Sequence, residues 1–191
     1  MYTKIKSFGL YGLNTFPVDV EISLTRGTPT IEIVGLPDNA VKESRERIRS
    51  ALQSISIPIP PKRIIINLAP ADVKKTGTMY DLGMLLGLLV GLEQLPPQPE
   101  TRYFLGEVSL SGHVRRINGV LSMALLAAQK GAIELYVPKE NAAEASAAGI
   151  DVYGVDHIAD LFAYLSGMAA IPKQPPYLPT KKRRRRSLRF F

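Results

Sequence analysis

The sequence contains no cysteine and only two histidines. Without thiols, neither disulfides nor thiolate-bound metal sites can form, and this composition is typical of proteins from reducing compartments. The histidines, His113 and His157, are far apart in the sequence and do not form the ligand pair of a helical metal site. We therefore expect no metal site.

Long apolar runs are also missing. The longest uncharged apolar run covers residues 82–92, whereas a membrane-spanning helix needs about 20 residues. The N-terminal residues MYTKIKSFGLYGL are interrupted by glycines and lack the apolar centre of a secretory signal. We predict a cytoplasmic protein with no membrane span.

The formal net charge of +7 is confined to one end of the chain, which leaves 17 basic and 17 acidic side chains in residues 1–180. Adjacent like charges repel, so we predict a disordered tail over 181–191 that binds nucleic-acid or lipid phosphates without sequence preference. The tail is either a selected nucleic-acid arm or the product of a frameshift or premature stop. Its basic residues are Lys181, Lys182, Arg183, Arg184, Arg185, Arg186 and Arg189.

The first half of the chain begins with a run of predicted strands. Residues 3–13, 16–26 and 30–34 are predicted as strands of an antiparallel meander, and polar and apolar residues alternate in the second and third of them. A helix capped by Asp38 and ending near Ile55 follows. Its charges, Arg47 among them, are interpreted as a solvated face rather than a recognition surface.

The centre of the sequence is a strand, a polar loop and a very apolar helix. Residues 64–66 are three isoleucines, which is typical of a strand buried on both faces. Asp81 is predicted to cap the helix over 82–92 and is also a candidate to hold an arginine or lysine of a partner. The loop between them is where binding residues are expected. The candidate interaction loop consists of Asp72, Lys74, Lys75, Gly77 and Asp81.

In the second half of the sequence, strands are predicted at 102–108, 133–137 and 151–153, with a tight hairpin over 106–115. Helices are predicted over 119–130 with Asn118 as cap, over 141–148 and over 157–166. The whole is expected to be one α/β (α+β) domain over residues 1–168, a sandwich of mixed sheet and helices. A proline-rich linker over 169–180 and the basic tail over 181–191 complete the predicted organisation.

Four segments, NLAPAD, GEVSLSG, GVLSMALLA and VPKENAAEA, occur in an order and spacing that carry a family resemblance. The chain resembles the amino-terminal domain of the YifB/ComM family of bacterial Mg-chelatase-like AAA+ ATPases. The resemblance implies a two-layer sandwich like the proteolytic domain of Lon and the carboxy-terminal domain of RadA-type proteins, a ribosomal-protein domain-2-like fold. It also implies that the chain stops before the ATPase module of the family.

The resemblance to Lon implies positions for a serine nucleophile and a lysine base. In this sequence Met79 and Ser122 occupy them. A thioether has no proton to lose and a serine hydroxyl cannot replace an amine as base, so peptidase activity at this site is excluded and no catalytic residue is assigned. A relocated pair of Ser122 with Lys74 or Lys75 is the alternative.

The sequence contains no G-x-x-x-x-G-K-[ST] phosphate-binding loop. We therefore expect no cofactor in this chain, with ATP and Mg²⁺ belonging to the ATPase module of the family. The ComM branch implies a hexameric motor that drives DNA branch migration in natural transformation and recombination, which makes DNA and further copies of the chain the implied partners.

Three functions are compatible with the sequence. The first is a non-catalytic domain of a ComM-like ATPase, and the second is a degenerate Lon-like hydrolase with a relocated nucleophile. The third is a nucleic-acid-binding module that acts through the basic tail.

Overall fold

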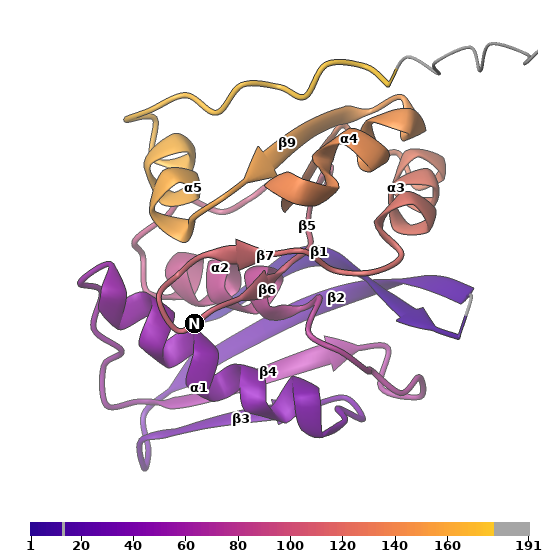
Figure 1. Cartoon of the computed structure of the whole chain (residues 1–191). Helices are drawn as coiled ribbons and strands as arrows, with labels where there is room; N and C mark the ends of the chain where they lie inside the picture. Colours follow the sequence, from indigo (N-terminus) through magenta and orange to yellow (C-terminus); the bar gives the residue numbers. More distant parts are fainter. Residues whose placement is uncertain (13, 178–191) are drawn as a thin grey trace, which may run out of the picture.

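A seven-stranded sheet organises the chain, with its strands in the order β3-β4-β2-β1-β5-β8-β9 (Figure 1). The computed structural model describes residues 1–12 and 14–177. The strands are β1 (Tyr2–Tyr11), β2 (Asn14–Thr25), β3 (Thr30–Val34), β4 (Arg63–Ala69), β5 (Arg102–Phe104), β8 (Glu134–Pro138) and β9 (Asp151–Val155), and a separate hairpin joins β6 (Glu107–Val108) to β7 (Val114–Arg115). The α-helices are α1 (Asn39–Ser54), α2 (Asp81–Gly91), α3 (Val120–Gln129), α4 (Ala142–Ala145) and α5 (Ile158–Leu165), with 3₁₀ turns at Lys139–Asn141 and Ser146–Ala148.

The helices flank a sheet that is mostly parallel, so the mixed α/β class predicted from the sequence is confirmed. In Figure 1, α1 lies across β3 and β4, whereas α3, α4 and α5 gather around β9 in the other half. The central helix α2 contacts β1, β2 and α1, and all of its residues are buried. This is why its sequence is apolar on every side.

Glycines recur every fourth residue along α2 and form the side of the helix that faces β2. A Cβ atom at Gly87 would lie 2.6 Å from Ile22 Cδ1, so the absence of a side chain lets the helix approach the strand closely. Because residues four apart share a helix face and alternate residues share a strand face, the two series match. Gly83, Gly87 and Gly91 lie opposite Val20, Ile22 and Leu24.

The predicted antiparallel meander is wrong at its third strand. β1 and β2 pair antiparallel as expected, but β3 pairs in parallel with β4, from Thr30 with Arg63 to Val34 with Asn67. β4 therefore lies between β2 and β3. The reason is the crossover through α1, which returns the chain to the start of β3, so that the next strand runs in the same direction.

The burial of β4 on both faces is also not observed. Ile64 and Ile66 are fully buried against the helices, while Ile65 is only partly buried on the other face. That other face carries polar pairs in this half of the sheet, such as Lys6 with Asp19, whose Nζ and Oδ1 lie 2.8 Å apart. β4 thus follows the ordinary alternation of a sheet with one open face.

The second half follows the predicted order of elements except at the predicted strand over 102–108, which is interrupted at residues 105–106: β5 joins the main sheet and β6 joins the separate hairpin. The inward residues of α3 are those expected, Val120, Met123, Ala124 and Ala127. The predicted cap Asn118 is wrong, because Gly119 occupies the N-cap position with a left-handed φ of 78°. A Cβ atom there would lie 2.8 Å from Leu10 Cδ2, so both conformation and contact favour glycine.

The chain after α5 runs along the free edge of β9. The amide of Gln174 donates to the carbonyl of Val152 at 2.7 Å, Tyr153 forms a bridge with Lys173, and Ile171 packs on the core. The first part of the predicted linker is therefore extended against the sheet. Residues 178–180 and the predicted basic tail, 181–191, lie outside the described residues.

No helix in the described residues has the length and apolar character needed to cross a membrane.

Candidate functional site

The loop between β4 and α2 forms one wall of a pocket of about 420 Å³. The opposite wall comes from the end of β1 and from the segment that enters α3. Segments from three distant parts of the sequence thus meet beside the start of the central helix. The pocket is lined by Leu10, Gly12, Thr76, Gly77, Thr78, Met79, Glu107, Arg116, Ile117 and Asn118.

Asp81 does not cap α2. Tyr80 occupies the N-cap position without a side-chain bond, and Asp81 is the first residue of the helix, fully buried. Its carboxylate accepts hydrogen bonds from the Ser44 hydroxyl and from the Val108 amide at 3.1 Å. The predicted cap is therefore wrong, because the carboxylate turns toward α1 and β6 instead of the first turn of its own helix.

Arg47 completes the set of donors around Asp81. Its Nε lies 2.7 Å from Asp81 Oδ2 and its Nη2 lies 3.1 Å from Oδ1. The same Nη2 also donates to the Ala40 carbonyl at 3.0 Å and to the Ser44 hydroxyl at 2.8 Å. The interpretation of all α1 charges as a solvated face is wrong for Arg47, whose side chain is only 17% exposed.

The two charges of this pair respond differently to their surroundings. Burial raises the pKa of Asp81, while the hydrogen bonds from Arg47, Ser44 and Val108 act in the opposite direction. The hydrogen bond to Asp81 raises the pKa of Arg47, so the guanidinium keeps its charge. Because every group around the carboxylate is a donor, Asp81 is ionised and its oxygens are already occupied by its own chain.

Lys75 is the second charged residue of the predicted interaction loop that the structure buries completely. Its Nζ donates to the carbonyl oxygens of Pro70 and, at 2.6 Å, of Val73. Burial lowers the pKa of Lys75, and the attraction of Asp72 acts weakly against this. The ammonium group therefore holds two parts of the β4–α2 loop together and does not face the pocket.

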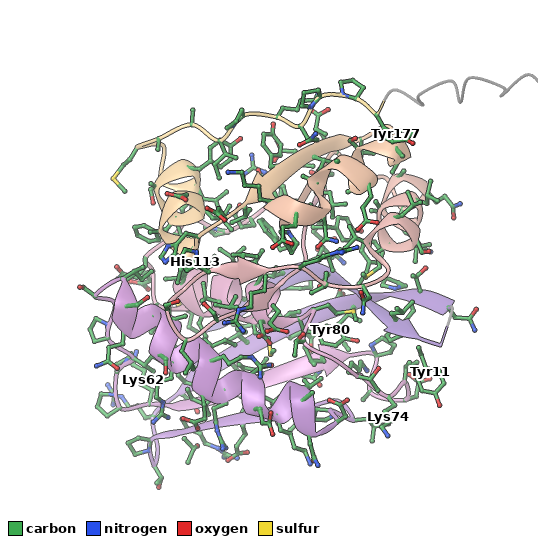
Figure 2. The ribbon with its side chains drawn as sticks, in the orientation of Figure 1. Tyr11, Lys62, Lys74, Tyr80, His113 and Tyr177 are labelled. Atoms are coloured by element: carbon green, nitrogen blue, oxygen red, sulfur yellow. The ribbon has the colours of Figure 1, made fainter. Side chains whose placement is uncertain are left out.

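The other members of the predicted loop remain accessible. Asp72 and Lys74 are exposed, and Lys74 is labelled at the periphery of the molecule in Figure 2. Gly77 lines the pocket with a φ of 84°, and its amide donates to Asp38 Oδ2 at 3.3 Å. Of the five residues predicted for the candidate interaction loop, only Asp72, Lys74 and Gly77 are therefore accessible to a partner.

The polar edge of the pocket is formed by Glu107. The Thr78 hydroxyl donates to Glu107 Oε2 at 2.6 Å, and Arg115 Nη1 lies 3.7 Å from Oε1. Glu107 thereby joins the β4–α2 loop to the β6–β7 hairpin. Sequence reasoning did not select Glu107 or Arg47, because only the paired geometry distinguishes them from other surface charges.

The family of the chain is established by a match over most of its length. Residues 20–141 match the family model described as subunit ChlI of Mg-chelatase. The chain belongs to this ChlI family. The matched residues include Arg47, the β4–α2 loop and Asp81, so the buried ion pair lies within the family domain.

Two relatives of the ChlI-family chain are similar over most of its residues. It is 39% identical over 157 residues, 81% of the chain, to competence protein ComM of Haemophilus influenzae, and 38% identical over 167 residues, 86% of the chain, to the YifB protein of Escherichia coli. These alignments cover 31% of ComM and 33% of YifB, so the chain spans about a third of the length of each. The predicted resemblance to the YifB/ComM family is confirmed.

The ChlI-family chain is also similar to Lon protease 2 of Bacillus subtilis, with 24% identity over 154 residues, 72% of the chain and 28% of that protease. This similarity agrees with the predicted Lon-like fold. Met79, at the predicted serine position, lines the pocket and is 8% exposed, whereas Ser122 is exposed on α3 and does not line it. The relocated pair of Ser122 with Lys75 is disfavoured, because the Lys75 amine is buried against carbonyl oxygens.

The two histidines of the ChlI-family chain meet in space, which the sequence did not suggest. His113 and His157 form an isolated strand bridge, and their ring centroids lie 4.8 Å apart in an edge-to-face arrangement. His157 caps α5 by accepting from the Ala159 amide at 3.1 Å, and its Nε2 bonds the Ser111 carbonyl. Within residues 1–12 and 14–177, no group of three histidine or carboxylate side chains is arranged to hold a metal ion.

Proposed function

We propose that this chain is a non-catalytic amino-terminal domain of a ComM-like AAA+ protein, and that it positions a partner for an ATPase module. The contacts of Asp81 are the observation that carries this proposal. The carboxylate at the head of the central helix, beside the pocket, is held by four donors from its own chain. A group held in this way stabilises the junction of α1, α2 and β6 and has no lone pair left for proton transfer to a substrate.

The chemistry at the Lon-like positions supports the same proposal. Met79 offers a thioether where the resemblance implies a hydroxyl nucleophile, and the buried Lys75 amine does not reach the pocket. The purified chain is therefore expected to hydrolyse neither ATP nor an unfolded protein substrate such as casein. Phosphate release above a buffer blank, or casein cleavage that survives repurification, would exclude the non-catalytic role.

DNA is the partner that we propose for the full protein. One relative is named a competence protein, and the resemblance associates the ComM branch with branch migration on DNA in natural transformation. In the chain itself, the predicted DNA contacts are the seven basic residues of 181–191. Binding through them depends steeply on salt and little on sequence.

The DNA proposal is tested by fluorescence anisotropy with a labelled duplex and a labelled four-way junction. The whole chain is compared with a variant that lacks residues 181–191, at low and at physiological salt. Loss of binding on deletion assigns DNA binding to the tail. Binding that survives the deletion assigns it to the folded body, and no binding by either chain would reject DNA as the partner of this domain.

The remaining features of the proposal concern the full-length protein. We propose that ATP and Mg²⁺ are bound by a separate ATPase module, that the protein assembles as a hexamer through that module, and that it acts in the cytoplasm. The domain of residues 1–168 then acts as the accessory part and the proline-rich residues 169–180 as the connection.

A further inference from the structure

The two edges of the seven-stranded sheet differ. At one edge, residues 173–174 already run along β9, where the Gln174 amide donates to the Val152 carbonyl at 2.7 Å. At the other edge lies β3, which pairs only with β4 among the described residues. An uncovered edge offers a row of backbone donors and acceptors to another extended chain.

The free backbone groups of β3 can be assigned to two residues. Thr30 donates its amide to the Lys62 carbonyl at 3.3 Å, toward β4. Because backbone groups of successive residues in a strand point to opposite sides, Ile31 and Ile33 direct theirs away from β4. Their amides and carbonyls have no backbone partner in the described chain.

A groove follows this edge between β3 and α1. One hollow of about 470 Å³ is bounded by Thr30 and Ile31 on one side and by the end of α1 and the proline-rich residues 57–61 on the other. A second hollow of about 380 Å³ continues along residues 31–34. Both are bounded by Ile31, so together they run the length of the strand.

The walls of the groove are basic. Lys42 and Arg45 face its second hollow, and Arg49 and Lys62 face its first. The spacing of 42, 45 and 49 places the three α1 side chains on one face of the helix. In the described part of the chain, neither Lys42 nor Arg49 pairs with a carboxylate, and Figure 2 labels Lys62 beside α1.

The acidic residue that borders the groove does not neutralise these charges. Glu32 also lines the second hollow, but its carboxylate is engaged by Arg63, whose Nη2 lies 3.6 Å from Oε2. Arg45 Nε lies 3.0 Å from Oε1 of Glu46 on the same helix, but both side chains are exposed and free to exchange partners. The groove therefore combines unpaired strand groups, an apolar proline-rich end and an excess of positive charge.

We propose that this groove binds an extended acidic segment of a partner protein, which adds to β3 as a further strand. The free groups of Ile31 and Ile33 would pair with the backbone of the segment, and its acidic side chains would face Lys42, Arg45 and Arg49. Charge also argues against the chain's own basic residues 181–191 as the occupant, because they would be repelled.

Fluorescence anisotropy on the whole chain tests the proposal with a labelled peptide of about seven residues that alternates glutamate and valine, which is long enough to cover the 5 residues of β3. A peptide with lysine in place of glutamate is the charge control. The variant Lys42→Glu with Arg49→Glu should raise the Kd about tenfold or more. Lys130→Glu, an exposed lysine at the end of α3, is the matched control and should leave the Kd within about twofold.

Two N-methylated peptides test the strand pairing without altering the protein. Methyl groups on alternate amides block either the amides that face β3 or those that face away, so one pattern should abolish binding and the other should preserve it. Equal binding of both peptides would overturn the proposal, as would an unchanged Kd for the double charge reversal, since the acidic peptide would then be held by the basic tail.

Two other occupants of the groove, a second copy of the chain and DNA, would give results that differ from those expected for an acidic peptide. If sedimentation shows that the chain self-associates and Ile33→Pro abolishes the association, a second copy is the occupant and the proposal is rejected. If the double charge reversal weakens duplex DNA binding but not peptide binding, the groove is a nucleic-acid surface and the proposal is again rejected. None of these outcomes bears on the non-catalytic role, and the deletion of residues 181–191 tests DNA binding by the tail in a separate experiment.

Discussion

Arg47 Nε lies 2.7 Å from Asp81 Oδ2, and this buried pair connects the middle of α1 to the first residue of the central helix. The carboxylate has no solvent exposure, while the arginine side chain is 17% exposed. Val108 of β6 donates to the same carboxylate, so three elements that are distant in the sequence meet at one charge. Removing either partner leaves the other without compensation in a poorly solvated position.

Replacement of Arg47 by methionine is expected to lower the free energy of unfolding by about 3–5 kcal/mol, because Asp81 remains buried without its cation. The measurement is urea unfolding at neutral pH. Addition of Asp81→Leu to this variant removes the stranded charge and should recover at least about 1 kcal/mol. If the double variant loses as much stability as the sum of the losses of the two single variants, the two residues are not coupled and the prediction is contradicted.

The stability loss of Arg47→Met should also depend on pH. Burial raises the pKa of Asp81, so a folded chain without the arginine binds the proton more tightly than the unfolded chain does. Its stability then increases as the pH falls through the folded pKa toward the ordinary value of 3.8. Urea midpoints at pH 7 and about pH 4.5 should show a smaller deficit at the lower pH. A stability loss of Arg47→Met that is the same at both pH values would contradict the raised pKa of Asp81.

Lys75 predicts a pH effect in the alkaline range. Burial lowers the pKa of its amine below 10.5, so in the window between the folded value and 10.5 the unfolded chain binds more protons. This group therefore makes stability rise with pH in that window. The unfolding free energy of the wild-type chain should therefore rise relative to that of Lys75→Met between about pH 8 and pH 10. A flat difference would show that the amine titrates normally in the fold.

The glycines of α2 provide a matched pair of substitutions. Gly87→Ala places a Cβ 2.6 Å from Ile22 Cδ1 and should lower stability by about 1–3 kcal/mol through overpacking. Gly83→Ala places a Cβ at an ordinary 3.4 Å from Val20 and gains helix propensity, so it should be neutral or stabilising by up to about 1 kcal/mol. Thermal unfolding of both variants compares them, and equal effects would contradict the close approach at Gly87.

Tyr80 is expected to tolerate the loss of its hydroxyl. The residue is fully buried, labelled at the interior in Figure 2, and its hydroxyl has no hydrogen-bond partner among the described residues. Tyr80→Phe should therefore raise the free energy of unfolding by about 1 kcal/mol. Tyr136→Phe is the control, because its hydroxyl donates to Glu134 at 2.7 Å and its loss should destabilise by a similar amount.

Local patterns in the sequence were sufficient for most elements. The stripe Val120, Met123, Ala124 and Ala127 is buried as predicted, and Asp38 caps α1 by accepting from the Val41 amide at 2.8 Å. The buried central helix predicted over 82–92 is found one residue earlier, at Asp81–Gly91. These features depend on neighbours within about one helical turn, so the sequence contains their causes.

Strand order and side-chain partners could not be predicted in the same way. The position of β4 between β2 and β3 depends on the crossover through α1. The interpretation of Arg47 as solvated failed because a single arginine on a charged helix has no local signal that distinguishes a buried partner. The meeting of His113 with His157 likewise depends on the packing of α5 beside the hairpin.

The sequence by itself determined the identity and order of the elements, the family, and the absence of thiol chemistry, because each depends on residue type and short-range spacing. Only the tertiary structure decided which charges are paired and which edge of the sheet is free. Asp81 is held by Arg47, and β3 is left open beside Lys42 and Arg49, because helix packing and strand order bring together residues that the chain keeps far apart.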